Sequence, residues 1–216
     1  MNALKPVAAV KRVLVVLWFA LAAPATFAEE IAPDALMKQI SDEVIAAIRQ
    51  DQAIQAGDTA KIAALVEASI LPHFDFVRIT QLAMGTGWRQ ASAAQKDELR
   101  REFQTLLVRS YSGALAGYSG QVIEFSPLRA KPGDTEVTVR SRIRQSGAES
   151  IAIEYDLEKS AAGWKVFDVR INGISLIATY RTAFAEEVRN RGVDGLIALL
   201  ASKNRERRAQ SAPRRT

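Results

Sequence analysis

The run Trp164–Leu200 constrains the fold more than any other part of this sequence. Trp164–Ile171 is rich in β-branched and aromatic residues, which is typical of a strand, and the Asn172-Gly173 pair after it is a strong turn signal. From Ser175 onward, apolar residues recur every three or four positions, which predicts a helix with one buried face. Gly192 interrupts this pattern, and we expect a second, short helix to follow it.

Four helical segments are predicted ahead of the first strand. Asp58 and Asp75 each precede an apolar period and are suited to cap a helix, and Ser92 with Gln95 forms a capping-box pattern. The longest segment keeps its apolar stripe from end to end, so we expect it to be packed along its whole length. The predicted segments are Pro33–Ile48, Asp58–Ile70, Asp75–Gly85 and Ser92–Tyr118.

Three strands are predicted between the long helix and Trp164, the first of them the short Gln121–Phe125. In Thr135–Arg144 and Ser150–Glu158 apolar residues alternate with charged ones, and Gln145-Ser146-Gly147 joins the two as a hairpin. Arginines face outward on one strand and acids on the next, so cross-strand ion pairs would fix the register. We therefore expect an α+β fold with a twisted antiparallel sheet wrapped by helices, the long and C-terminal helices covering its apolar face.

The two ends of the chain differ in composition from the rest. Residues 1–28 combine basic residues with a short apolar stretch and end at Ala28, which predicts a cleaved signal peptide and an exported protein. The chain has no cysteine, so it has no thiol for a lipid anchor or a disulfide. Residues 203–216 are basic and lack an apolar period, so we expect a disordered tail.

The formal net charge of +5 is misleading as an indication of binding partners. Of the 29 basic residues, three lie in the predicted signal peptide and six in the tail, which leaves 20 against 23 acidic residues in between. The high isoelectric point therefore reflects the tail, and no nucleic-acid-binding face is expected.

Two stretches also carry a distinctive order and spacing of residues. The first contains Trp164, Asp168, Asn172-Gly173-Ile174-Ser175-Leu176, Tyr180-Arg181, Phe184 and Gly192-Val193-Asp194-Gly195-Leu196. The second contains Ile70-Leu71-Pro72-His73-Phe74-Asp75-Phe76, Leu82-Ala83-Met84-Gly85, Trp88-Arg89, Gln95, Phe103, Leu106-Leu107, Tyr111, Leu115 and Tyr118. Together they resemble the MlaC, or toluene-tolerance, family of periplasmic phospholipid-binding proteins. The resemblance covers residues 32–202 and implies a single phospholipid-binding domain over residues 29–202, with an NTF2-like or cystatin-like cone and an N-terminal helical lobe.

The resemblance also implies a function. A member of this family would be a soluble periplasmic carrier that moves phospholipid between the outer and inner membranes and so bears on outer-membrane lipid asymmetry. Its implied partners are an outer-membrane lipoprotein complex and an inner-membrane ABC transporter with a lipid-binding periplasmic subunit, which it would meet by transient docking at the membrane. We expect a monomer with no cofactor and no metal, the bound phospholipid being its cargo.

A carrier of this kind needs an apolar pocket for the acyl chains. The sheet face and the helices expected to close over it supply the candidate lining. The candidate lipid-binding residues are Val137, Val139, Ile143, Ile151, Ile153 and Tyr155 on the strands, and Leu106, Tyr111, Leu115, Ile174, Ile177 and Tyr180 beyond them.

Two alternatives remain open. One is an enzyme of the same fold class that acts on a hydrophobic substrate, with His73 or Asp168 as a base. We expect no catalytic residues, because His73 has no orienting carboxylate nearby in sequence, and Asp168 is better placed to pair with an Arg or to cap the following turn. The other alternative is a carrier of a different lipid, such as an isoprenoid or a hopanoid.

Overall fold

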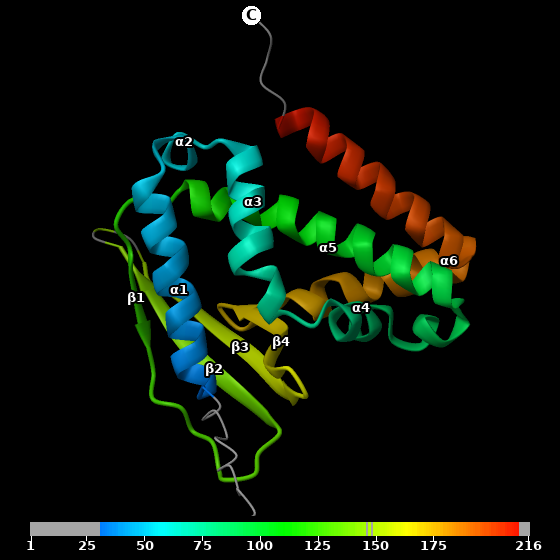
Figure 1. Cartoon of the computed structure of the whole chain (residues 1–216). Helices are drawn as coiled ribbons and strands as arrows, with labels where there is room; N and C mark the ends of the chain where they lie inside the picture. The colour runs from blue at the N-terminus through cyan, green and yellow to red at the C-terminus, as the bar shows by residue number, and fades with distance from the viewer. Residues whose placement is uncertain (1–30, 146, 148, 212–216) are drawn as a thin grey trace, which may run out of the picture. The chain divides into compact units, whose positions relative to one another are not determined.

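The computed structural model describes residues 31–145, 147 and 149–211 (Figure 1). The predicted signal peptide, Ser146 of the predicted hairpin and residues 212–216 of the predicted tail lie outside the described residues. The helices are α1 (Pro33–Gln50), α2 (Gln52–Gln55), α3 (Thr59–Ser69), α4 (Phe76–Met84), α5 (Ala93–Ala116) and α6 (Leu176–Ser211), with 3₁₀ turns η1 (Leu71–His73) and η2 (Gly85–Gln90). The strands are β1 (Val122–Phe125), β2 (Glu136–Arg144), β3 (Ile151–Ser160), β4 (Gly163–Ile171) and β5 (Ile174–Ser175).

The strands form one antiparallel sheet in which each strand pairs with the next one in sequence. Val139 lies opposite Tyr155, and Ile153 lies opposite both Ser141 and Ile171 on its two neighbouring strands. Because side chains alternate between the faces of a strand, these mostly apolar residues share one face of the sheet.

The opposite face carries the predicted charged rows. The Nε atom of Arg140 on β2 lies 2.8 Å from the carboxylate of Glu154 on β3. Arg170 on β4 lies 2.8 Å from the same carboxylate and 2.5 Å from that of Asp156. Hydrogen bonds from Arg170 and Arg140 lower the pKa of Glu154. The predicted cross-strand ion pairs are therefore confirmed.

The register of β3 and β4 contains one irregularity. Asp156 pairs with Asp168 and Leu157 pairs with Val166, so Phe167 has no partner on β3. Such a bulge bends its strand and increases the local twist. Here the ring of Phe167 lies under the guanidinium of Arg78 from α4, with the carbon of that group 3.8 Å from the ring centroid.

The predicted helix caps are present. The side chains of Asp58 and Asp75 accept hydrogen bonds from backbone amides of the first turns of α3 and α4. Ser92 and Gln95 form both hydrogen bonds of a capping box at the start of α5. The short helix α2 was not predicted, and its cap is Asp51, which accepts from two backbone amides. Local capping therefore explains where most helices begin.

The C-terminal helix α6 is interrupted at Gly192, as predicted, where φ is 70° and the backbone is left-handed. It then continues to Ser211, whereas we expected disorder from residue 203 onward. The side-chain amide of the buried Asn204 donates to the backbone oxygen of Glu102 on α5 at 2.9 Å and to its carboxylate at 2.6 Å. These bonds hold the polar end of α6 along α5.

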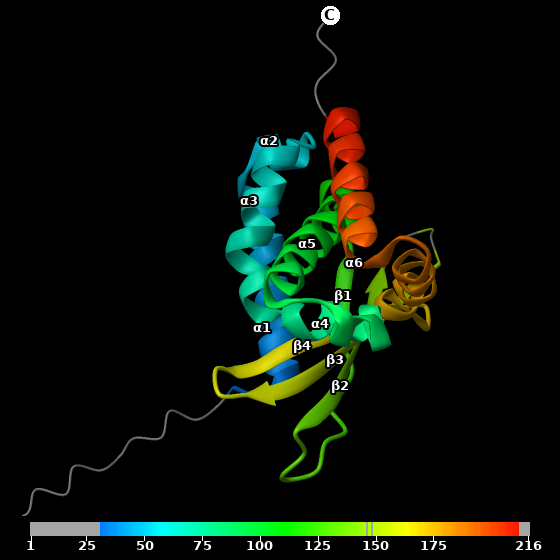
Figure 2. The same ribbon diagram turned by 90° about the vertical axis from the view of Figure 1, so that its right-hand side faces the viewer.

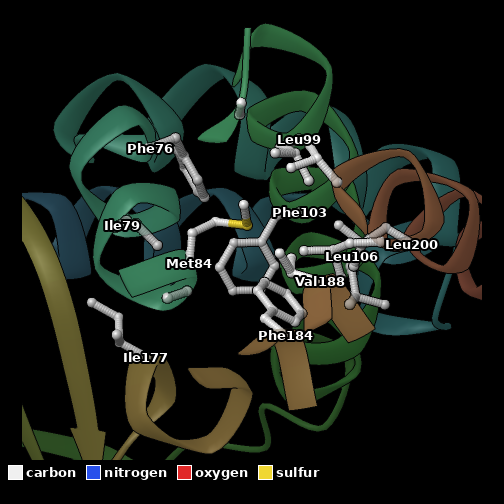
Figure 3. Packing of buried hydrophobic residues seen from close by; sticks show 14 residues of the cluster. Phe76, Ile79, Met84, Leu99, Phe103, Leu106, Ile177, Phe184, Val188 and Leu200 are labelled. Carbon is white, nitrogen blue, oxygen red and sulfur yellow. The ribbon is translucent and has the colours of Figure 1, made fainter. Parts of the chain in front are cut away.

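The buried hydrophobic residues form two clusters. The first lies between α4, α5 and α6, where Phe103 and Phe184 meet edge to face with centroids 4.9 Å apart and Met84 lies beside them (Figure 3). The second lies between the sheet and the N-terminal helices and includes Val139 and Leu157. In Figure 2, strands β2, β3 and β4 lie below α3 and α5, which run side by side. The predicted α+β class is confirmed.

Candidate functional site

A cavity of about 300 Å³ lies between the two hydrophobic clusters. Its sheet side is formed by β3 and β4, and its helix side by α3, α4, α5, the first turn of α6 and the segment around η1. The sheet side consists of Ile153, Tyr155, Phe167, Asp168, Val169 and Ile171. The helix side consists of Val66, Ile70, Leu71, Phe74, Phe76, Ile79, Phe103, Leu107, Val108, Tyr111, Ser112, Ala114, Leu115, Leu176 and Ile177.

The cavity arises from the way in which the helices are distributed over the sheet. The helix α1 packs against β2, so the apolar face is filled at that side. In contrast, α5 packs chiefly against α3, α4 and α6. The apolar side chains of α5 therefore face those of β3 and β4 across an open space. The long helix covers the sheet, as predicted, but part of the space beneath it is hollow.

Four lining residues bring polar side-chain atoms to the cavity, namely Tyr111, Ser112, Tyr155 and Asp168. The hydroxyl of Ser112 donates to the carbonyl oxygen of Val108 in its own helix at 2.5 Å. The hydroxyl of Tyr111 lies close to that of Tyr180, and burial raises the pKa of Tyr111. Burial also raises the pKa of Tyr155, so both phenols lining the cavity stay neutral at physiological pH.

The fourth polar residue, Asp168, is occupied in holding the start of α6. Its carboxylate accepts a hydrogen bond from the hydroxyl of Ser175 at 2.5 Å and from the backbone amide of Ile177 at 3.3 Å. It also accepts from the amide of Val169 at 2.8 Å. Of the two roles expected for Asp168, pairing with an Arg or capping the turn after its strand, the structure shows the capping role. A cavity of hydrocarbon with so few free hydrogen-bonding groups suits an apolar ligand.

The twelve candidate lipid-binding residues fall into three groups. Five of them line the cavity, namely Tyr111, Leu115, Ile153, Tyr155 and Ile177. Four lie close by without lining it: Leu106, Val137 and Val139 are buried in the clusters, and Tyr180 packs edge to face on Phe103. The remaining three, Ile143, Ile151 and Ile174, lie on the cavity face of the sheet but beyond the lining.

Most of the lining was absent from that candidate set. Val169 and Ile171 could have been included, because they alternate on the strand that follows β3. The contributions of α3, α4 and the η1 segment could not have been found in this way, since nothing local in the sequence shows that Val66 or Phe76 faces β4. Their positions depend on the backbone of Phe74, which bridges to Val166.

The residues considered as possible bases offer no free base at the cavity. His73 lies in η1 and does not line the cavity. Partial burial lowers the pKa of its imidazole, and the nearby charge of Lys165 lowers it further, against an opposing effect of Glu43. Among the residues that the structure describes, no group of three or more His, Asp or Glu side chains is placed to hold a metal ion.

Other hollows on the described surface have a different character. They measure about 430 to 640 Å³, and charged side chains contribute to each. The largest, between α3, α5 and the end of α6, is lined in part by Arg109, Arg207 and Arg208. The cavity under α5 is thus the best candidate site for an apolar molecule.

In addition, no helix of residues 31–211 that the structure describes is long and apolar enough to cross a bilayer.

Fold and site together define an α+β protein with an apolar cavity between a meandering sheet and its covering helices. Comparison with known proteins agrees with this class. The family model described as MlaC protein matches residues 38–202, and the chain therefore belongs to the MlaC family. This confirms the resemblance found in the sequence.

Individual relatives are similar over much of the chain. The intermembrane phospholipid transport system binding protein MlaC of Haemophilus influenzae is 24% identical over 171 residues, which are 78% of this chain and 80% of the relative. The toluene tolerance protein ttg2D of Pseudomonas putida is 28% identical over 106 residues, 49% of either chain. Among solved structures, a phospholipid-binding protein from Ralstonia solanacearum in complex with a phospholipid is 39% identical, with a TM-score of 0.78. That comparison covers 82% of this chain and 99% of the solved one.

Proposed function

We propose that this protein is a phospholipid carrier that encloses acyl chains in the cavity between α5 and strands β3 and β4. The observation that carries the proposal is the composition of the cavity, which is hydrocarbon except for four residues, most of whose polar atoms are already bonded. The similar structure from Ralstonia solanacearum, which is described as a complex with a phospholipid, supports the choice of ligand.

The need for such a carrier follows from the cost of exposing hydrocarbon to water. Two acyl chains contain on the order of 30 methylene groups, and each contributes about 0.8 kcal/mol when it leaves water. Unassisted transfer through an aqueous compartment therefore costs on the order of 20 kcal/mol. A cavity that encloses the chains removes most of this cost, while the polar headgroup can remain in water.

The size of the cavity adds a further requirement. Taking a methylene to occupy about the volume of a water molecule, roughly 30 Å³, the cavity holds on the order of ten methylene groups. Two complete chains need more space than this. We propose that the gap between α5 and the sheet widens when the carrier holds two chains, and that headgroups outside the cavity are selected only weakly.

We place this carrier in the periplasm, where it would exchange phospholipid with an outer-membrane lipoprotein complex and an inner-membrane ABC transporter. The predicted signal peptide supports export, and the relative from Haemophilus influenzae is named as part of an intermembrane transport system. We further propose that the chain has no catalytic activity of its own. Neither His73 nor Asp168 presents a free base to the cavity.

The experiment is to purify the mature protein from its native compartment without detergent and to identify its bound lipid by mass spectrometry. Near-stoichiometric diacyl phospholipid with mixed headgroups is the expected result. A protein without lipid, or one that holds a single isoprenoid or hopanoid species, would contradict the proposal.

Two variants that fill the cavity from opposite walls make this test specific. Leu107→Trp on α5 and Val169→Trp on β4 should each lower the bound phospholipid, because the added ring occupies the acyl-chain space. The matched control is Val77→Trp on the exposed face of α4, where the side chain is 51% exposed. It should retain as much phospholipid as the natural protein.

A further inference from the structure

The apolar lining of the cavity continues onto the surface at one end of the sheet. Ile153 and Ile171 line the cavity and lie opposite each other on β3 and β4. Ile151 is two residues before Ile153 on the same strand, so it lies on the same face. Ile174 on β5 lies opposite Ile171, and Ile143 on β2 lies opposite Ile151. Cross-strand neighbours on one face are in side-chain contact range.

We call Ile143, Ile151 and Ile174 the isoleucine rim. Ile174 is 67% exposed and Ile151 is 41% exposed, whereas Ile143 is half-buried. Isolated exposed apolar residues are common on protein surfaces and need no explanation by themselves. The isoleucine rim is different, because it adjoins the lining of the cavity. Ile174 lies opposite the lining residue Ile171, and Ile151 is two residues before the lining residue Ile153.

The helix side of the cavity also reaches the surface near the start of α6. Tyr111 on α5 lines the cavity and is 38% exposed, and its hydroxyl lies close to that of Tyr180. Tyr180 is six residues after Ile174, on the first turns of α6. Thus the first turns of α6, which follow Ile174 in the chain, also approach the exposed Tyr111 through Tyr180.

We propose that the isoleucine rim is the path by which the acyl chains of a phospholipid pass between the cavity and an external apolar phase. This inference rests on the proposed function. A chain that leaves the cavity directly into water exposes its methylene groups before it reaches an acceptor. A chain that slides over Ile151 and Ile174 keeps part of its apolar contact during the transfer, which lowers the barrier.

The rim therefore acts on the rate of exchange and not on the amount of lipid bound at rest. None of its three residues lines the cavity, so a polar substitution there leaves the contacts of the enclosed chains unchanged. The variant is Ile151→Thr with Ile174→Thr, because threonine is β-branched and suits a strand. The matched control is Val77→Thr with Val122→Thr, two apolar residues that are 51% and 58% exposed and do not line the cavity.

The measurement is the transfer of a fluorescent phospholipid from loaded protein to vesicles of phosphatidylethanolamine and phosphatidylglycerol. The rim variant should transfer several-fold more slowly than the natural protein at equal lipid content, and the control should be unchanged. Equal rates in the two double variants would overturn the inference. If the natural protein contains no phospholipid, the proposed function itself fails, which is a different outcome.

A second measurement remains informative if the rim variant folds poorly. The chain has no cysteine, so Ile174→Cys and Val122→Cys can each be labelled at a single site with a dye whose emission reports a change to an apolar environment. With the same vesicles, the emission of the dye at residue 174 should shift to shorter wavelength, whereas that of the dye at residue 122 should not. Equal shifts at both positions, or no shift at either, would contradict the inference.

Discussion

The carboxylate of Asp168 on β4 accepts a hydrogen bond of 2.5 Å from the hydroxyl of Ser175, the residue that precedes α6. The same carboxylate accepts a hydrogen bond from the backbone amide of Ile177 in the first turn. The Ser175 hydroxyl oxygen in turn accepts a hydrogen bond from the backbone amide of Ala178. The two side chains thus cap α6 where that helix forms part of the cavity wall.

We expect Asp168→Ala to lower the free energy of unfolding by about 1–2 kcal/mol, because it removes a helix cap and leaves the Ser175 hydroxyl without this acceptor. The Asp168→Asn variant keeps an acceptor oxygen, so its free energy of unfolding should fall by less than that of Asp168→Ala. Urea denaturation of both variants measures the difference. If both variants were as stable as the natural protein, Asp168 would not be a capping residue.

The packing of α4 on the sheet depends on Arg78. Its guanidinium stacks on Phe167, lies 2.6 Å from the carboxylate of Glu136 and is also paired with Glu158. Exposed ion pairs contribute about 0–1 kcal/mol, and a cation–π contact adds about 0.5–2 kcal/mol.

Replacement of Arg78 by Ala should therefore lower the free energy of unfolding by about 1–2 kcal/mol. Arg144→Ala is the matched control, because Arg144 lies 3.3 Å from the carboxylate of Glu124 in an exposed ion pair. The control should change stability by less than about 0.5 kcal/mol. Similar losses in the two variants would show that the Phe167 stack contributes nothing.

Asn204 is a buried polar anchor near the end of α6. Asn204→Ala removes both hydrogen bonds to Glu102 and should lower the free energy of unfolding by about 1–3 kcal/mol. Hydrogen exchange should become faster in residues 203–211 in particular. Arg205→Ala at the exposed neighbouring position is the control and should alter neither quantity. Unchanged exchange in the Asn204 variant would mean that the helix end is held by other contacts.

The stability of the protein should decrease as the pH falls through the range in which His73 titrates. The pKa of His73 is lowered from 6.5 in the folded protein, so the unfolded chain binds the proton more tightly. The contribution of neutral His73 to the free energy of unfolding is therefore present above about pH 6.5 and is lost as the pH falls below it. Glu154 and Asp51 also have lowered pKa values, but carboxylates titrate at more acidic pH.

The test compares the natural protein with His73→Asn in urea at pH values from about 7 to 5. The natural protein should lose more stability than the variant over this range. Parallel curves would contradict the assignment to His73. Because His73 lies outside the cavity, lipid content should be the same in both proteins.

The order of elements could be predicted from local signals in the sequence. Asp75, Ser92 and Gly192 mark helix boundaries through backbone hydrogen bonds and a left-handed backbone, which depend on few neighbours. The path of α6 beyond residue 202 could not be predicted, because it depends on a bond from Asn204 to a residue distant in sequence.

The cavity could be predicted only in part, and Val139 and Ile153 show why. Both are β-branched, both alternate with charged residues and both lie on the same face of the sheet. Val139 is 1% exposed within the packed cluster, whereas Ile153 faces the cavity. Alternation determines the face on which a side chain lies, but the helix that covers that face determines whether the space is filled.

The most direct test of the account is photo-crosslinking with a phospholipid that carries a photoreactive group near the end of one acyl chain. The natural protein is loaded with this lipid and irradiated, and the modified peptides are identified by mass spectrometry. Crosslinks to the cavity lining, such as Leu107, Ile153 and Val169, are expected. They should be lost in the cavity-filling tryptophan variants. Crosslinks confined to the charged face of the sheet or to the groove beside Arg207 would contradict the proposed function.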